Sequence, residues 1–273
     1  MRAWYVALLL LAACNRSSAA KRFPGVQLAT STVEAPATKG IPVVVVSKTA
    51  ISLEGGAQLA DIPPSAGADG LDAKYMRGGA RDMFIKPLGD ALSANMSPPE
   101  VAFAFDASTP YRVVSEVLYT AGQSKVSGDH LLADGQGHVV EVIVHPPHLM
   151  MPVGFGGASG KIGDLPALAL NLIIAPEGIT ITAAGRNVAP GCMSFGVGAP
   201  TVPAGRGVWD SALLGLCVAA LKGASPAFAG EKQAVITAGG TTPWSEVMRA
   251  ADVIRKDKSG APMLTDVVFG IAR

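Results

Sequence analysis

The stretch VAFAFDASTPYRVV, residues 101–114, places a compact apolar strand directly before the start of a helix. Residues 101–105 have the length and the β-branched and aromatic character of a buried strand. Thr109 is a favoured helix N-cap, and Pro110 suits the first helical position because its fixed φ is already helical. The apolar residues that follow recur on one helical face: Val113, Val114, Val117, Leu118 and Ala121. The stretch predicts a strand followed by a helix that packs on its sheet.

A second stretch, AVITAGGTTPWSEV at residues 234–247, repeats this order near the end of the chain. The helix-start motif returns with the same residue types: Thr109, Pro110 and Tyr111 in the first copy, Thr242, Pro243 and Trp244 in the second. Apolar strand pairs precede both copies, at residues 42–47 with 50–53 and at residues 168–175 with 178–181. This repeat predicts an α+β chain of two tandem similar units, each a small mixed β-sheet with two helices packed on it.

The expected units span residues 41–148 and 167–273, with a glycine-rich linker at 149–166. Within them, further strands are expected at 139–144 and 267–272 and a helix at 209–221. A helix at 79–94 would turn Met83, Leu88 and Leu92 inward, although Pro87 should end or kink it. Residues 55–70 are rich in Gly, Pro and Asp, which is typical of a loop.

The segment from Met1 to Cys14 has the pattern of a bacterial lipoprotein signal. Arg2 supplies a basic start, residues 3–10 are apolar, and Leu11-Ala-Ala-Cys14 is a small-residue cleavage box ending on a cysteine. An ordinary secretory signal with an incidental Cys14 is the alternative. We expect residues 1–13 to be removed and Cys14 to carry the lipid, palmitate included, that anchors an exported chain in the cell envelope, facing the periplasm.

Residues 14–40 are rich in Ser, Ala, Thr and Pro and lack hydrophobic periodicity, so they predict a flexible tether. No later segment reaches the roughly 18 uncharged apolar residues of a membrane-spanning helix. The lipid would then be the membrane attachment. Asn15 beside it favours the outer over the inner membrane, by analogy with lipoprotein sorting in well-studied bacteria.

In these pieces the chain resembles the periplasmic domain of the ExbD/TolR family of biopolymer-transport proteins, which couple proton flow to work in the envelope. Val43–Val46 with residues 51–53 is similar to the family's opening hairpin, and residues 101–114 are similar to its strand, aspartate and proline-aromatic helix start. The second copy matches likewise, except that Gly239 stands where Asp106 would align. The resemblance covers both expected units.

The resemblance implies an exported domain that dimerises and contacts envelope partners, such as an inner-membrane motor complex or a cell-wall component. Family members also carry a transmembrane helix with an aspartate on the proton path. Here the first acidic residue is Glu34, so no carboxylate can sit at bilayer depth in this chain. The expected role is therefore non-enzymatic protein binding, without cofactors, and an exposed edge strand could accept a partner's strand.

Charge and cysteine content narrow the function classes further. A formal net charge of +1 without a basic cluster gives no field that would hold nucleic acid. After lipidation, Cys192 and Cys217 are the remaining cysteines, and export would let them form a disulfide worth roughly 3.5 kcal/mol. Two separate buried thiols are the alternative; neither cysteine has the setting of a catalytic thiol.

The competing hypothesis is an exported hydrolase or metal-dependent enzyme on an unrelated α+β fold. All four histidines lie between His130 and His148, and polyproline geometry in His145-Pro-Pro-His148 would put two imidazoles on one side. Zinc needs further ligands, which His130 and His138 could supply only if their hairpin folds back. Residues 154–161 fail the spacing of a phosphate loop, and Ser159 lacks the frame of a hydrolase nucleophile.

Overall fold

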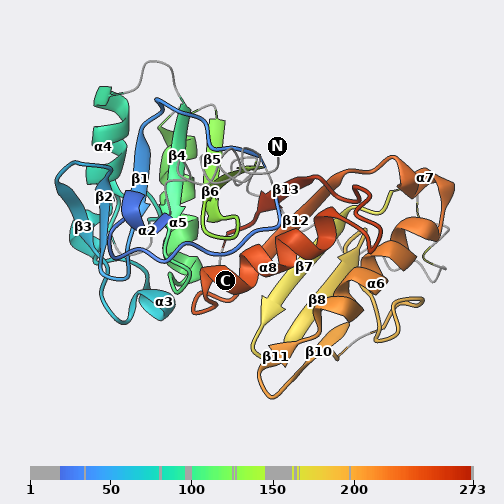
Figure 1. Cartoon of the computed structure of the whole chain (residues 1–273). Coiled ribbons are helices and arrows are strands. Elements are labelled where there is room, and N and C mark those ends of the chain that lie inside the picture. The colour runs from blue at the N-terminus through green and yellow to red at the C-terminus, as the bar shows by residue number, and fades with distance from the viewer. Residues whose placement is uncertain are drawn as a thin grey trace, which may run out of the picture.

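Two mixed β-sheets with helices packed on them form the protein, as seen in a computed structural model (Figure 1). The structure describes residues 19–33, 35–79, 82–95, 100–124, 126, 128–144, 162, 165, 167–196 and 198–271. The chain forms one sheet from its N-terminal half and the other from its C-terminal half. One continuous apolar core joins them, because residues of both, such as Val44 and Leu172, belong to the same buried cluster. The α+β class expected from the sequence is confirmed.

The first sheet has the strand order β3-β2-β1-β4-β5-β6. The central strands β1, β4 and β5 are parallel, and the outer neighbours pair antiparallel. The strands are β1 (Val43–Val46), β2 (Ala50–Leu53), β3 (Gln58–Asp61), β4 (Glu100–Phe105), β5 (Gly128–Asp134) and β6 (Val139–Val144). Helices α4 (Lys86–Asn95) and α5 (Tyr111–Gln123) bury their apolar faces against it, with the short α3 (Ala66–Asp69) and the 3-10 turn η1 (Ala73–Tyr75) beside them.

The second sheet has the order β11-β10-β8-β7-β12-β13, with β9 also paired to β8. Its strands are β7 (Leu170–Ala175), β8 (Gly178–Ala183), β9 (Arg186–Asn187), β10 (Val202–Gly205), β11 (Val208–Trp209), β12 (Gln233–Ala238) and β13 (Asp266–Phe269). Here too the strands β7, β12 and β13 are parallel. Helices α6 (Ser211–Gly223) and α8 (Trp244–Arg255) pack on it, and α7 (Pro226–Ala229) follows α6.

Two elements differ from the sequence expectations. Helix α4 begins at Lys86, so Pro87 lies in its first turn, where a missing N–H costs nothing, and does not break it. Met83 precedes the helix, whereas Leu88 and Leu92 are buried as expected. Residues 58–61, expected in a loop, form β3 because they extend the hairpin of β1 and β2.

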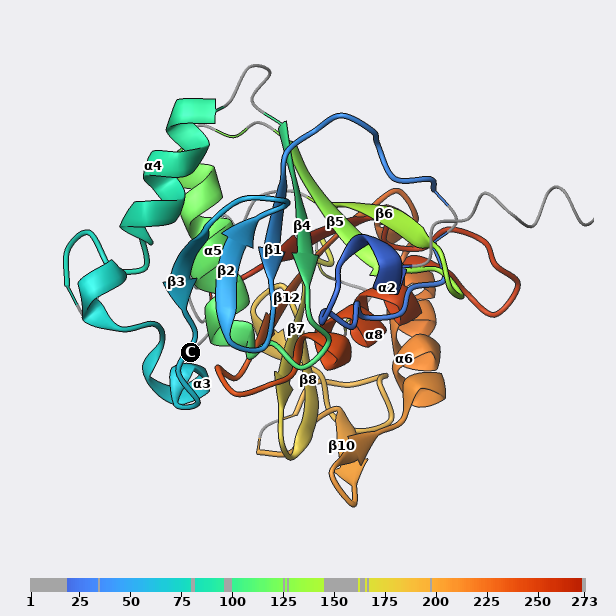
Figure 2. The same cartoon turned by 60° about the vertical axis from the view of Figure 1, so that its left-hand side comes forward.

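Residues 19–33 and 35–38, which we call the strap, lie against the first sheet and do not form the flexible tether expected for residues 14–40. The strap opens with α2 (Ala19–Arg22), which Figure 2 shows in front of this sheet. Its apolar side chains are buried against the sheet face opposite the helices: Phe23, Val26 and Leu28 contact a cluster of Val43, Ala102, Ala104 and Leu132. Burial of these three side chains outweighs a composition that is otherwise typical of a linker.

Across the residues that the structure describes, no helix is both long and apolar enough to cross a bilayer.

Candidate functional site

The two helix-start motifs lie against each other, although they belong to opposite halves of the sequence. Pro110 and Pro243 form an antiparallel bridge. The Tyr111 N–H donates to the Thr242 carbonyl and the Trp244 N–H to the Thr109 carbonyl, both over 2.8 Å. Two further bonds flank these: Arg112 N–H to Gly240 O (3.0 Å) and Ser245 N–H to Ala107 O (2.9 Å). Four backbone bonds therefore join the two halves at one junction.

Neither threonine acts as the N-cap that the sequence predicted. Helix α5 begins at Tyr111 with Pro110 in the N-cap position, and α8 begins at Trp244 with Pro243 there; both prolines are extended, with ψ near 140°. The threonines lie one residue further out, in the extended segments that pair across the junction. Their carbonyl groups accept hydrogen bonds from the opposite half. This backbone pairing fixes the start of each helix, where the sequence predicted a side-chain cap.

The aromatic residues of the motifs reach across the junction into the main core. The Tyr111 hydroxyl lies 3.0 Å from the Ile236 carbonyl oxygen and 2.5 Å from that of Gly270, both in the second half. Complete burial raises the pKa of the Tyr111 phenol, so it stays a neutral donor. The Trp244 ring contacts Phe105 at the end of β4 and Phe269 in β13, with centroids 5.4 and 5.1 Å apart. These contacts give the motif a structural role.

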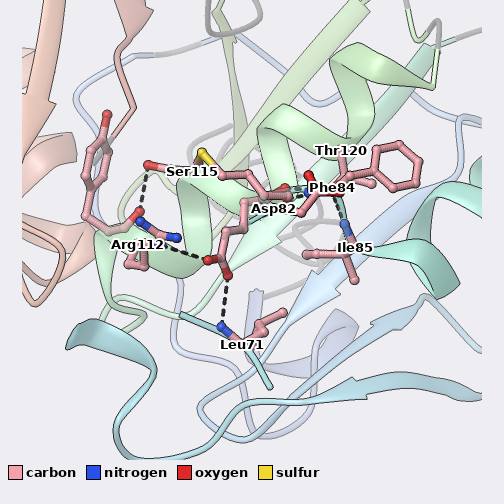
Figure 3. A network of polar contacts seen from close by, with 10 residues as sticks. Leu71, Asp82, Phe84, Ile85, Arg112, Ser115 and Thr120 are labelled. Atoms are coloured by element: carbon pink, nitrogen blue, oxygen red, sulfur yellow. Dashed lines mark hydrogen bonds and ion pairs between the residues drawn. The ribbon is translucent and has the colours of Figure 1, made fainter. Parts of the chain in front are cut away.

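A buried carboxylate, Glu116, organises the first half beside this junction (Figure 3). It accepts hydrogen bonds from Arg112 Nε over 2.7 Å and from the Leu71 N–H over 3.1 Å. Burial raises the pKa of Glu116, and the bonds from Arg112 and Leu71 oppose that shift. Gly70 has φ +80°, and a Cβ at this position would clash with a carboxylate oxygen of Glu116. The glycine therefore leaves the space that the Glu116 carboxylate occupies. Glu116 thus fixes the chain after α3 onto α5.

Three carboxylates accept hydrogen bonds from backbone N–H groups of the strap, and no local sequence pattern links any of them to it. Asp106 accepts from Gln27 over 2.9 Å, and Asp252 on α8 accepts from Thr32 over 2.7 Å. Glu141 on β6 accepts from Thr38 over 2.6 Å. Asp106 had been noted only through the family resemblance. The role of the three carboxylates depends on a tertiary contact that no local pattern announces.

His130 is paired with one of these carboxylates. Its Nδ1 lies 2.6 Å from Glu141 Oε1, while Glu141 Oε2 holds Thr38. Among the described residues there is no group of three or more His, Cys, Asp or Glu side chains that could hold a metal. The weak metal candidates His145 and His148, and the lipidation candidate Cys14, lie outside the described residues.

Cys192 and Cys217 form a disulfide, with Cα atoms 5.1 Å apart. Cys217 is fully buried in α6, and Cys192, in the loop after β9, is 5% exposed. The bridge ties that loop to the helix, which is a structural role.

Neither family models, nor curated proteins, nor solved structures give a match to this chain.

Acidification should weaken the hold of Glu141 on the strap. Burial raises the pKa of Glu141, but hydrogen bonds from Thr38 and His130 outweigh it and hold the pKa below its usual value. A lowered folded-state pKa means that this stabilisation is present above the unfolded pKa, about 4.3, and is lost as pH falls through the folded-state value. Glu141→Gln should therefore cost about 1.5 kcal/mol at pH 7, and its cost should fall as the pH is lowered to 3.

Urea unfolding of both proteins at pH 3 and pH 7 checks this. The pKa of Glu116 is shifted in the opposite direction: it is raised, so protonation of Glu116 favours the folded state. Glu116 is present in both proteins and cancels in the comparison. An equal loss at both pH values would contradict the role of the Glu141 charge.

Proposed function

We propose that the chain is a non-enzymatic, lipid-anchored envelope protein, made of two tandem ExbD/TolR-like units, that faces the periplasm and acts by binding a protein partner. The proposed role does not include proton conduction. Cys14 would hold the lipid. The alternative, an exported enzyme, finds no support in the geometry of the described ionisable groups.

The observation that carries this proposal is the common strand register of the two sheets. In the first hairpin Val46 pairs with Ile51, and in the second hairpin Ile174 pairs with Ile179. Ile174 follows Val46 in the sequence by the same number of residues as Ile179 follows Ile51. On the other side, Val46 pairs with Phe105 and Ile174 pairs with Ala238. The number of residues between Phe105 and Ala238 equals the number between the two helix-start motifs. Equal register along three strands supports a duplication more strongly than a shared element order does.

The order of the strands adds to this support. Five strands of each sheet have the same order along the chain and the same neighbours in the sheet: β3-β2-β1-β4-β5 in the first and β10-β8-β7-β12-β13 in the second. In both sheets a helix precedes and follows the strand beside the hairpin, which is β4 in the first and β12 in the second. The junction is reciprocal as well: Tyr111 and Arg112 donate to the second half as Trp244 and Ser245 donate to the first. In a family whose exported domains pair, two units in one chain would form a built-in dimer. A further homodimer would then need a different surface.

Four buried or partly buried carboxylates are used in contacts within the chain. Glu116 and Glu141 each use both carboxylate oxygens in contacts with other residues of the chain. Asp106 and Asp252 are likewise committed to the strap or their own loop. A general acid or base needs an oxygen that can reach a substrate. These four carboxylates serve the fold.

Edge strand β3 is the partner site that we favour. The other three edge strands are less suited to a partner strand. The strap forms a bridge to β6 at Val140, β13 is buried, and β11 is only two residues long. On β3, Gln58 and Asp61 are exposed. An extended partner segment could add to this edge through backbone hydrogen bonds.

Photo-crosslinking in the producing cell tests the partner. A photoreactive residue at Gln58 should capture an inner-membrane motor subunit or a cell-wall component, identified by mass spectrometry. The same residue at exposed Lys258, on the other half, is the matched control and should not capture it. Absence of any such product at Gln58, with the protein present at normal level, would refute binding at this edge.

Metabolic labelling tests the anchor separately. Wild-type protein should incorporate labelled palmitate and sediment with membranes, whereas Cys14→Ser should do neither, because the thiol that carries the lipid is gone. A wild-type protein that stays in the soluble periplasmic fraction would show that Cys14 is not an anchor.

A further inference from the structure

The strap is held by a small apolar cluster of its own. Phe23, Val26 and Leu28 pack on one face of the first sheet, and this cluster is separate from the main core that lies on the other face. The main core contains Val44, Phe103 and Phe105, which point away from the cluster because neighbouring residues of a strand face opposite sides. Of the strap residues, Ala29 and Val33 also pack against the main core. Departure of the strap would therefore uncover the small cluster and these two contacts, and leave the rest of the main core packed.

The polar contacts of the strap are scattered along it. They include an ion pair of Arg22 with Glu54 and backbone bonds at Gln27, Ala29, Ser31 and Ala35. Within the described ranges it meets the rest of the chain in isolated bridges, Leu28 with Asp106, Thr30 with Asp134 and Pro36 with Val140, and no continuous ladder forms. Between them, its N–H groups bind carboxylates of β6, of α8 and of the residue after β4. Asp252 also accepts from the Ser31 hydroxyl over 2.8 Å. None of these bonds is part of the pairing within either sheet.

The strap joins β1 through an exposed turn. Lys39 and Gly40 are both exposed, and Gly40 has φ +82° with no atom within 4 Å of the place a Cβ would take. Glycine has no Cβ and can change its backbone dihedrals at low steric cost. The turn can therefore serve as a hinge.

We propose that the strap is a detachable segment, which opens as one unit about Gly40 while both sheets stay folded. Opening breaks the apolar cluster and the carboxylate contacts together, because they hold the same short piece of chain. Local opening below the global unfolding free energy is expected where a segment has few buried side chains and few shared backbone bonds. The inference does not depend on the proposed lipid or partner.

Hydrogen exchange followed by NMR, amide by amide, tests this on the full chain with Cys14→Ser, so neither acylation nor a partner is involved. In this protein the Gln27, Ser31 and Thr32 amides should exchange at least tenfold faster than the hydrogen-bonded amides of β4 and β12. Asp252→Asn should speed exchange at all three about a further tenfold, because it removes the charge that strengthens both hydrogen bonds Asp252 accepts from the strap. Exchange in β4 and β12 should not change.

Asp72→Asn is the matched control, since Asp72 also accepts a backbone N–H, from Lys74, in a part of the chain that makes no described bond to the strap. Acceleration at Thr32 alone would overturn the proposal, because only the broken bond would then have responded. So would equal rates in strap and strands. Phe23→Ala, which removes only a strap side chain, provides a second test: it too must accelerate all three amides and spare both strands. Failure of palmitate labelling or crosslinking would leave this result unaffected.

Discussion

Trp244→Ala should lower the free energy of unfolding by about 3–5 kcal/mol, the range for removing a large buried aromatic side chain. Trp244 is 1% exposed and packs between Phe105 of the first sheet and Phe269 of the second. The truncation leaves a cavity at the junction between the halves. Both sheets line it, so neither can close it without moving against the other.

Urea unfolding followed by circular dichroism measures this loss without relying on tryptophan fluorescence. Trp244→Phe is the control: it keeps a ring against Phe105 and Phe269 and should lose about half as much. The junction would not stabilise the fold as described if Trp244→Ala cost less than about 1 kcal/mol. Appearance of two separate transitions in Trp244→Ala alone would indicate that Trp244 couples the two halves.

Loss of the Cys192–Cys217 disulfide should cost about 3.5 kcal/mol. The bond closes a loop with a sequence separation of 25 residues, and in the chain-entropy model its main effect is to restrict the unfolded chain. Cys217 is fully buried in α6, so a double replacement by alanine avoids leaving a free thiol or a buried hydroxyl there. The fold should survive, because α6 also buries Leu214, Val218 and Leu221.

Denaturation with and without a reducing agent checks the second prediction. The wild-type midpoint should fall on reduction to near that of Cys192→Ala/Cys217→Ala, whose own midpoint should not respond to the reductant. An unchanged wild-type midpoint after confirmed reduction would mean that the bridge does not restrict the unfolded chain as expected.

Elements with strong periodicity could be predicted from the sequence, and contacts between distant segments could not. Strand β6 was expected at the residues it occupies, and α5 and α8 close to their observed starts, because apolar spacing is a local property. The reciprocal bonding of Thr109 and Thr242 uses backbone atoms, which every residue has. Nothing in either motif indicates its partner.

The strap was missed for a related reason. Phe23, Val26 and Leu28 are too few to set a period, and the bonds that hold the strap again use its backbone. Strand β5 was not singled out either, since it ends in the charged residue Asp134 and gains its stability from strands on both sides. Tertiary context determined both.

Docking of the strap would set the length of the free linker between an acylated Cys14 and the folded part of the protein, here called the body. The short piece of chain from Cys14 to Ala19 spans at most about 18 Å, so a docked body would stay beside the membrane. With the strap released, the chain from Cys14 to Ile41 could extend to roughly 90 Å. The volume open to the body would grow on the order of a hundredfold, and its effective concentration near any membrane-bound partner would fall accordingly. Strap docking would thereby decide which layer of the envelope the protein can search.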